Sequence, residues 1–174
     1  LDEVQVGMGR TGTLFAYEQS GIEPDIMTLA KALASGIPIG ATLAREAVAA
    51  GFGPGVHGST FGGNAVATAA AVATLEAMTA EGFLATVRAR GAYFLDRLER
   101  LAQRSTAIIS VRGCGLMLGV TLRDSGAPVV EACLARGLVI NCTAERVLRL
   151  LPPLIITEAE IDRGLAILEE VLCR

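Results

Sequence analysis

Short apolar runs with β-branched residues alternate along this chain with longer stretches that carry apolar residues at helical spacing. Residues 25–29 and 37–43 are runs of the first kind, and residues 83–103 repeat apolar side chains every three or four positions. A strand buries a face and a helix buries a stripe, so such a chain must stack helices on a sheet. The pattern predicts an α/β fold whose first part belongs to a doubly wound sheet.

Helix-capping residues set further boundaries. Asn64 is the expected N-cap of a helix that runs to about Met78, and Thr157 with Glu160 forms a capping box. Further helices are expected over residues 15–20, 45–50, 129–136 and 158–172, and further strands over residues 1–5, 108–111, 116–122, 138–141 and 147–150. The elements after about residue 105 form a small α/β unit. We therefore expect two domains, residues 1–104, which include the linking helix, and residues 105–174.

Composition and charge argue against several classes of protein. The net charge is −3 and there is no basic patch, so nucleic acid is not an expected partner. No apolar run approaches the roughly 18 residues that cross a bilayer. The four cysteines are widely spaced and the chain has one histidine, so no metal site is expected. This cysteine pattern fits a reducing, cytoplasmic compartment best.

Lys31 is the only lysine, and the other 14 of the 15 basic residues are arginines. Arginine does not deprotonate in practice and cannot form an ordinary imine with an aldehyde, whereas a lysine amine does both. The position therefore suggests covalent chemistry with a carbonyl group. The alternative is that one surface lysine has survived by chance.

A glycine-rich loop at residues 7–12 reads Gly-Met-Gly-Arg-Thr-Gly and fits the dinucleotide-binding pattern. That pattern requires a preceding strand, a helix that opens on the third glycine, and an acid at a later strand end. Here the loop continues through Thr13, and Asp25 begins a strand instead of ending one. We therefore interpret the loop as a turn whose glycines adopt positive φ.

Three groups together suit pyridoxal phosphate, which needs a lysine amine, an acid opposite its ring nitrogen and donors for its phosphate. Asp2 lies in the expected end of one strand and Lys31 follows another strand, so we expect one sheet edge to present both. Ser59 and Thr60 lie in a glycine-rich loop before a helix, where hydroxyl and backbone N–H groups bind phosphate. The sequence thus predicts a pyridoxal-phosphate site.

Four motifs follow one another along the chain: DEVQ at residues 2–5, GMGRTG at 7–12, PDI at 24–26 with Ala30-Lys31, and HGSTFGGN at 57–64. Together they resemble the class III aminotransferases, which have the type I fold of pyridoxal-phosphate-dependent transferases. The resemblance covers nearly the whole chain and corresponds to about the second half of a family member. It implies the second part of the large doubly wound domain followed by a small C-terminal α/β domain.

The resemblance implies cofactor-binding roles for five residues. Asp2 would pair with the pyridine N–H, Val4 would pack on the ring, and Gln5 would lie near the phenolic oxygen. Glu3 shares this motif, with a structural or salt-bridging role. Lys31 would hold the cofactor as a Schiff base and then act as base and acid in the proton shift.

It also implies roles outside that motif. Thr60 would bind the cofactor phosphate of a neighbouring subunit, which implies a homodimer with shared active sites. Ser59 would lie at the substrate, and Arg149 would bind a substrate carboxylate, although it could also be one of many surface arginines. The roles of Arg10 and His57 stay open.

The implied reaction moves an amino group between an amine-bearing substrate and a 2-oxo acid. The motifs are nearest to those of members that use N2-acetylornithine and 2-oxoglutarate in arginine biosynthesis. Relatives that use ornithine, 4-aminobutyrate or succinylornithine share them, and a pyridoxal-dependent mutase or a non-catalytic truncated relative is the alternative. The family's N-terminal half is absent, so we expect these 174 residues alone to be inactive or prone to aggregate.

Overall fold

The computed structural model describes residues 1–173, which form two compact units. The first unit is Leu1–Leu84, and the second begins at Ala85. The linking helix therefore belongs almost entirely to the second unit, in contrast to the expected boundary after residue 104. Its buried side chains explain the difference, because Phe94 borders the same apolar hollow as residues of the last helix. Each unit is described by itself.

The first unit holds a small sheet built around strand β1 (Ile26–Leu29). On one side it pairs antiparallel with β2 (Ala41–Ala44). On the other side Asp2 lies opposite Thr28 in a parallel bridge, with hydrogen bonds of 3.0 Å from Thr28 N to Leu1 O and from Glu3 N to Thr28 O. The strand expected over residues 1–5 is limited to this bridge, because the chain turns directly afterwards.

Strand β2 begins four residues later than the sequence suggested. Ile37 donates its N–H to Ala34 O at 3.1 Å and so completes a turn, and Pro38 has no N–H to offer a sheet. The short helices η1 (Ala16–Ser20) and η2 (Lys31–Ala34) are 3₁₀ helices, and α1 (Glu46–Ala49) is a single α-helical turn.

The long helix α2 (Ala65–Thr79) begins as predicted, with the Asn64 side-chain oxygen accepting the N–H of Ala67 at 2.9 Å. Its buried residues recur at helical spacing and are Ala67, Ala71, Thr74 and Met78. Thr74 reaches the hydroxyl of Ser35 at 3.3 Å, directly after η2. The buried side of α2 therefore supports η2, which carries Lys31.

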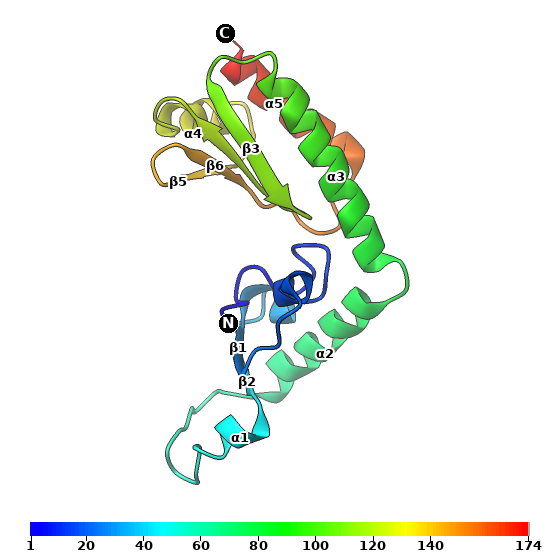
Figure 1. Ribbon diagram of the computed structural model, residues 1–174, viewed down its shortest axis with the longest axis vertical. Helices are drawn as coiled ribbons and strands as arrows, with labels where there is room; N and C mark the ends of the chain where they lie inside the picture. Colours follow the sequence, from blue (N-terminus) through cyan, green and yellow to red (C-terminus); the bar gives the residue numbers. More distant parts are fainter. Residues whose placement is uncertain (174) are drawn as a thin grey trace. The chain divides into compact units, whose positions relative to one another are not determined.

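The second unit contains a four-stranded antiparallel sheet in the order β3-β4-β6-β5 (Figure 1). Its strands are β3 (Ile108–Cys114), β4 (Met117–Leu122), β5 (Asn141–Thr143) and β6 (Val147–Leu150). Burial alternates along β4 and β6, so the residues of one sheet face are buried and those of the other are half-buried. Strand β5 starts at Asn141 rather than 138, because Leu138 still donates to Cys133 O at 2.9 Å, at the end of the preceding helix.

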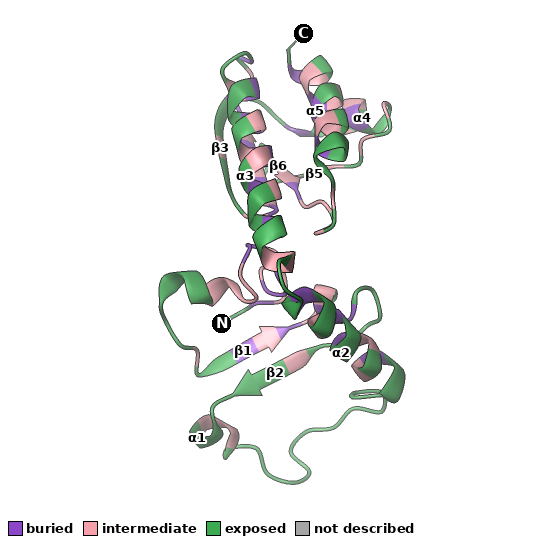
Figure 2. Cartoon of the chain, turned by 90° about the vertical axis from the view of Figure 1, so that its right-hand side faces the viewer, coloured by how far each residue is buried: buried purple, intermediate pink, exposed green. Residues whose placement is uncertain are grey.

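Three helices complete this unit: α3 (Phe83–Ala102), α4 (Ala127–Leu134) and α5 (Glu158–Leu172). Buried and exposed residues alternate around α3 and α5, as in helices that bury one side (Figure 2). The two helices are joined where the Tyr93 hydroxyl donates to the Asp162 carboxylate at 2.8 Å. The predicted capping box of Thr157 and Glu160 is present at the start of α5.

Candidate active site

Asp2 and Lys31 lie at the same edge of the first unit's sheet. Asp2 is paired in parallel with Thr28, and Lys31 follows β1 three residues beyond Thr28. Both side chains are exposed. An acid and an amine thus lie at the carboxyl ends of two adjacent parallel segments, and this edge is where α/β sheets bind ligands.

Lys31 has a strained backbone. Its φ is +48°, in the left-handed region that side chains other than glycine rarely adopt, and such strain concentrates at functional sites. The turn is held by a 2.9 Å hydrogen bond from Leu33 N to Ala30 O, and Leu33 and Ala34 are buried. The buried end of η2 therefore fixes the turn while the amine of Lys31 stays exposed.

The carboxylate of Asp2 is oriented by the turn that follows it. Its Oδ1 accepts the backbone N–H of Val4 at 2.9 Å. Val4 and Gln5 are half-buried in the same turn. The hydrogen bond restricts the Asp2 side chain, so the acid is held before any ligand arrives.

Glu3, in contrast to Asp2, is buried and only 3% exposed. Its two carboxylate oxygens accept the backbone N–H groups of Ala16 at 3.0 Å and Tyr17 at 2.8 Å. This engagement gives Glu3 a positioning role between Asp2 and η1. It also fills the N-terminus of the helix after the glycine loop, where a dinucleotide phosphate would have to bind.

The glycine loop folds tightly against Glu3. A Cβ on Gly7 would lie 2.7 Å from Glu3 O, and Met8, with φ of +54°, is 1% exposed. Burial lowers the pKa of the Arg10 guanidinium below its ordinary value. The loop is a packed turn, which agrees with the interpretation drawn from the sequence.

Ser59 and Thr60 lie on an exposed loop that precedes α2. Ser59 Oγ accepts the N–H of Gly62 at 3.0 Å, so its hydroxyl shapes the loop. His57 lies near Phe52, with 6.1 Å between ring centroids. Within residues 1–173 no hydrogen bond joins this loop to Asp2 or Lys31, so the structure does not bring Thr60 into their site.

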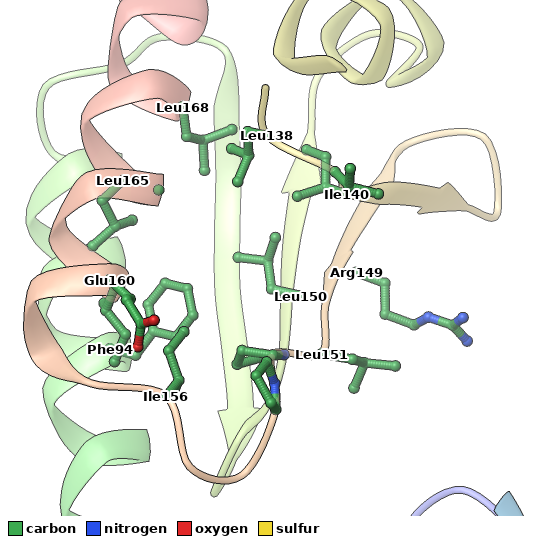
Figure 3. Close-up of a pocket in the computed structure, with 15 residues that line it drawn as sticks. Phe94, Leu138, Ile140, Arg149, Leu150, Leu151, Ile156, Glu160, Leu165 and Leu168 are labelled. Atoms are coloured by element: carbon green, nitrogen blue, oxygen red, sulfur yellow. The ribbon is translucent and has the colours of Figure 1, made fainter. Parts of the chain in front are cut away.

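Arg149 lies on β6 in the second unit, so its position relative to Lys31 is not defined. It pairs across strands with Gly119 and Asn141. In the amide orientation that satisfies both atoms, Asn141 donates to Arg149 O at 3.2 Å and accepts from Arg149 Nη2 at 3.1 Å. Figure 3 shows the guanidinium pointing away from the apolar side chains around Leu150.

Those apolar side chains border a hollow of about 280 Å³ that sequence reasoning did not anticipate. Leu138, Leu150 and Leu165 line it, and Glu160 is the one acidic residue among its lining side chains (Figure 3). The hollow offers packing surface rather than reactive groups. No group of acidic, histidine or cysteine side chains in residues 1–173 is arranged to hold a metal ion.

In the described part of the chain no single helix has the length and apolar character needed to cross a bilayer. Only α2 and α3 counted together, with a bend between them, meet that test.

The mixed α/β fold is that of the fold type I aminotransferases. The chain belongs to the aminotransferase class-III family, whose model matches residues 1–172. It is 52% identical over 174 residues to an acetylornithine aminotransferase of Caldanaerobacter subterraneus, covering 99% of this chain and 44% of that protein.

Solved structures of aminotransferases also match this chain. An acetylornithine aminotransferase from Elizabethkingia anophelis matches with a TM-score of 0.90 and 35% identity, over 98% of this chain and 46% of the other. An ornithine aminotransferase from Toxoplasma gondii, described with partial occupancy of pyridoxal phosphate at its active site, matches with a TM-score of 0.91 and 35% identity, over 98% and 41%. The chain thus spans less than half the length of these relatives.

Class III aminotransferases depend on pyridoxal phosphate. The first unit fits this cofactor, because an exposed lysine amine and an exposed, oriented carboxylate share one sheet edge. Asp2 and Lys31 are the residues that would hold its ring nitrogen and its aldehyde carbon.

Proposed function

We propose that the protein containing this chain moves an amino group from N2-acetylornithine to 2-oxoglutarate with the aid of pyridoxal phosphate. The observation that carries the proposal is Lys31, an exposed amine on a strained turn at the edge that also presents Asp2. The names of the similar proteins from Caldanaerobacter and Elizabethkingia support the choice of amino donor.

The residues of this chain have separate tasks. Pyridoxal phosphate, when bound, supplies an electron sink next to the reacting carbon. Asp2 would accept the ring N–H and so keep that nitrogen protonated. Lys31 would hold the cofactor through its aldehyde, and its amine, when free, would act first as the base and then as the acid of the 1,3-proton shift.

Three further residues are assigned to binding. Thr60 binds the cofactor phosphate of a neighbouring subunit, and the proposal therefore includes a homodimer with shared sites. Ser59 contacts the substrate, and Arg149 binds a carboxylate through its planar guanidinium. Arginine biosynthesis in the cytoplasm is the proposed setting.

A second candidate is transamination of ornithine. It is favoured by the likeness to the ornithine aminotransferase of Toxoplasma gondii. The two donors differ at the end of the substrate that carries the acetyl group, so the site around Lys31 serves either.

The test uses the full-length protein and begins with pyridoxal phosphate, borohydride reduction and peptide mapping. We expect the reduced cofactor on Lys31, because borohydride converts the imine to a stable secondary amine that marks the attachment point. The matched control is Lys31→Arg, which keeps a long cationic side chain but cannot form the bond. Label at another lysine, or equal label in the variant, would refute the assignment.

Single-turnover spectra then identify the donor. N2-acetylornithine, ornithine and 4-aminobutyrate are added separately to the loaded protein in the absence of any 2-oxo acid. We expect N2-acetylornithine to convert the cofactor fastest. Faster conversion by ornithine would replace the first candidate with the second.

A further inference from the structure

The half-buried face of the second unit's sheet carries a row of four residues from four strands. Arg112 on β3 lies opposite Gly119 on β4, Gly119 opposite Arg149 on β6, and Arg149 opposite Asn141 on β5. Residues directly opposite each other in antiparallel strands project from the same face. Two guanidinium side chains therefore flank a position that has no side chain.

Gly119 leaves space that Arg112 uses. A Cβ at this position would lie 3.8 Å from Cγ and 3.9 Å from Nε of Arg112, so the arginine side chain leans over the glycine towards β6. The backbones of β3 and β6 are about 9.5 Å apart, twice the usual spacing between strands. That separation is within reach of two long side chains that converge on one ligand.

Both arginines border one open hollow of about 440 Å³. Its other lining residues carry no charge, and they are Gly113, Cys114, Met117, Leu118, Gly119, Thr143 and Val147. Among residues 1–173 none forms an ion pair with Arg112. The face therefore combines two like charges with an uncharged floor, and an anion between the arginines would relieve their repulsion.

We propose that Arg112 is a further binding residue for the carboxylate of the substrate, acting with Arg149 across Gly119. The inference rests on the proposed function, which supplies a substrate of this chemical class. A guanidinium matches a carboxylate through two parallel N–H donors, and such charge-assisted bonds are the strong ones. Arg112 thus holds the substrate in place and takes no part in proton transfer.

The test measures binding of glutarate to the full-length, cofactor-loaded protein by calorimetry. Glutarate has two carboxylates and no keto group, so its affinity does not depend on transamination. We expect Arg112→Ala to weaken binding about tenfold, which corresponds to about 1.4 kcal/mol. Arg112→Lys should recover part of the loss, because a charge returns without the planar fork.

Two further variants separate a binding role from a structural one. Gly119→Leu fills the space between the arginines without changing the charge, and it should lower the affinity for glutarate as well. Arg100→Ala removes an exposed arginine that pairs with Asp96 on α3 and should leave affinity unchanged. The KM for the 2-oxo acid should rise in Arg112→Ala while kcat is retained.

Unchanged glutarate affinity in Arg112→Ala, with or without a loss of thermal stability, would overturn the proposal and indicate a structural arginine. Failure of the proposed function is distinguishable from this result. It would appear as absence of the borohydride label on Lys31, whatever the affinity for glutarate.

Discussion

The backbone of Lys31 is held in a left-handed conformation while its side chain is exposed, so the residue costs stability at a position whose amine is accessible to a ligand. Lys31→Ala keeps the Cβ and its strain, whereas Lys31→Gly removes both. We expect the glycine variant to be more stable than the alanine variant by about 1 kcal/mol. Both should lose attachment of the cofactor. Equal denaturation midpoints for the two variants would show that the turn is not strained.

Glu3 is the second residue for which the local structure predicts a measurable effect on stability. Glu3→Ala leaves the backbone N–H groups of the half-buried residues Ala16 and Tyr17 without their acceptor, and we expect a loss of about 2 kcal/mol in denaturant titrations. Glu18→Ala is the control, because Glu18 also accepts a backbone N–H, from Phe15 at 2.7 Å, but at an exposed position. A loss in Glu3→Ala no larger than in the control would contradict the positioning role.

The sequence predicted those features of the sheet edge that depend on local order along the chain. Lys31 follows a short apolar run, and Asp2 is paired in parallel with that run, so both lie at one sheet edge. The Arg112 row could not be found in this way, because antiparallel register brings together residues 112, 119 and 149, and the sequence does not state that register. The buried role of Glu3 depends on η1, thirteen residues away, and was equally hidden.

At the scale of elements, caps were predicted better than strands. Asn64 and the Thr157–Glu160 capping box are local hydrogen-bonding devices, and both are where the sequence placed them. Strands β2 and β5 start four and three residues late, because backbone hydrogen bonds donated by Ile37 and Leu138 close turns first. A strand has no comparable start signal, so its first residue depends on the partner strand.

Gly91 of α3 packs closely against the turn between β3 and β4. A Cβ there would meet the backbone oxygen of Gly115 far inside contact distance, so Gly91→Ala must push the helix away, and we expect a loss of about 1–3 kcal/mol. Gly164 of α5 is the matched control, because its Cβ would meet Leu138 at an ordinary 3.5 Å. Gly164→Ala should gain up to about 1 kcal/mol from helix propensity. Similar midpoints for the two variants would contradict the close packing.

The start of α5 should be sensitive to acid. Hydrogen bonds from the backbone and hydroxyl of Thr157 hold the pKa of the Glu160 carboxyl below its ordinary value. A lowered folded-state pKa stabilises the protein above the ordinary carboxyl pKa, and this contribution is lost as pH falls through the folded-state pKa. Glu160→Gln should therefore be less stable than the parent near neutral pH, and the difference should shrink in acid. Glu158→Gln, in the same helical turn, is the control in thermal denaturation at several pH values.

At the scale of the whole molecule, residues 1–84 expose much apolar surface around a sheet of only two strands and one bridge. The large exposed apolar residues there are Leu1, Ile22, Ile26, Ile37, Leu43, Phe52, Val56, Phe61, Val66 and Val72. Two-stranded sheets are marginally stable in water, and contiguous apolar surface promotes association.

We expect these 174 residues expressed alone to bind a hydrophobic dye, to scatter light at micromolar concentration and to lack transaminase activity. The full-length protein, measured in parallel, should neither bind the dye nor scatter light, and it should have transaminase activity. If the 174-residue chain is monodisperse and active, this apolar surface does not have to be covered by another part of the protein.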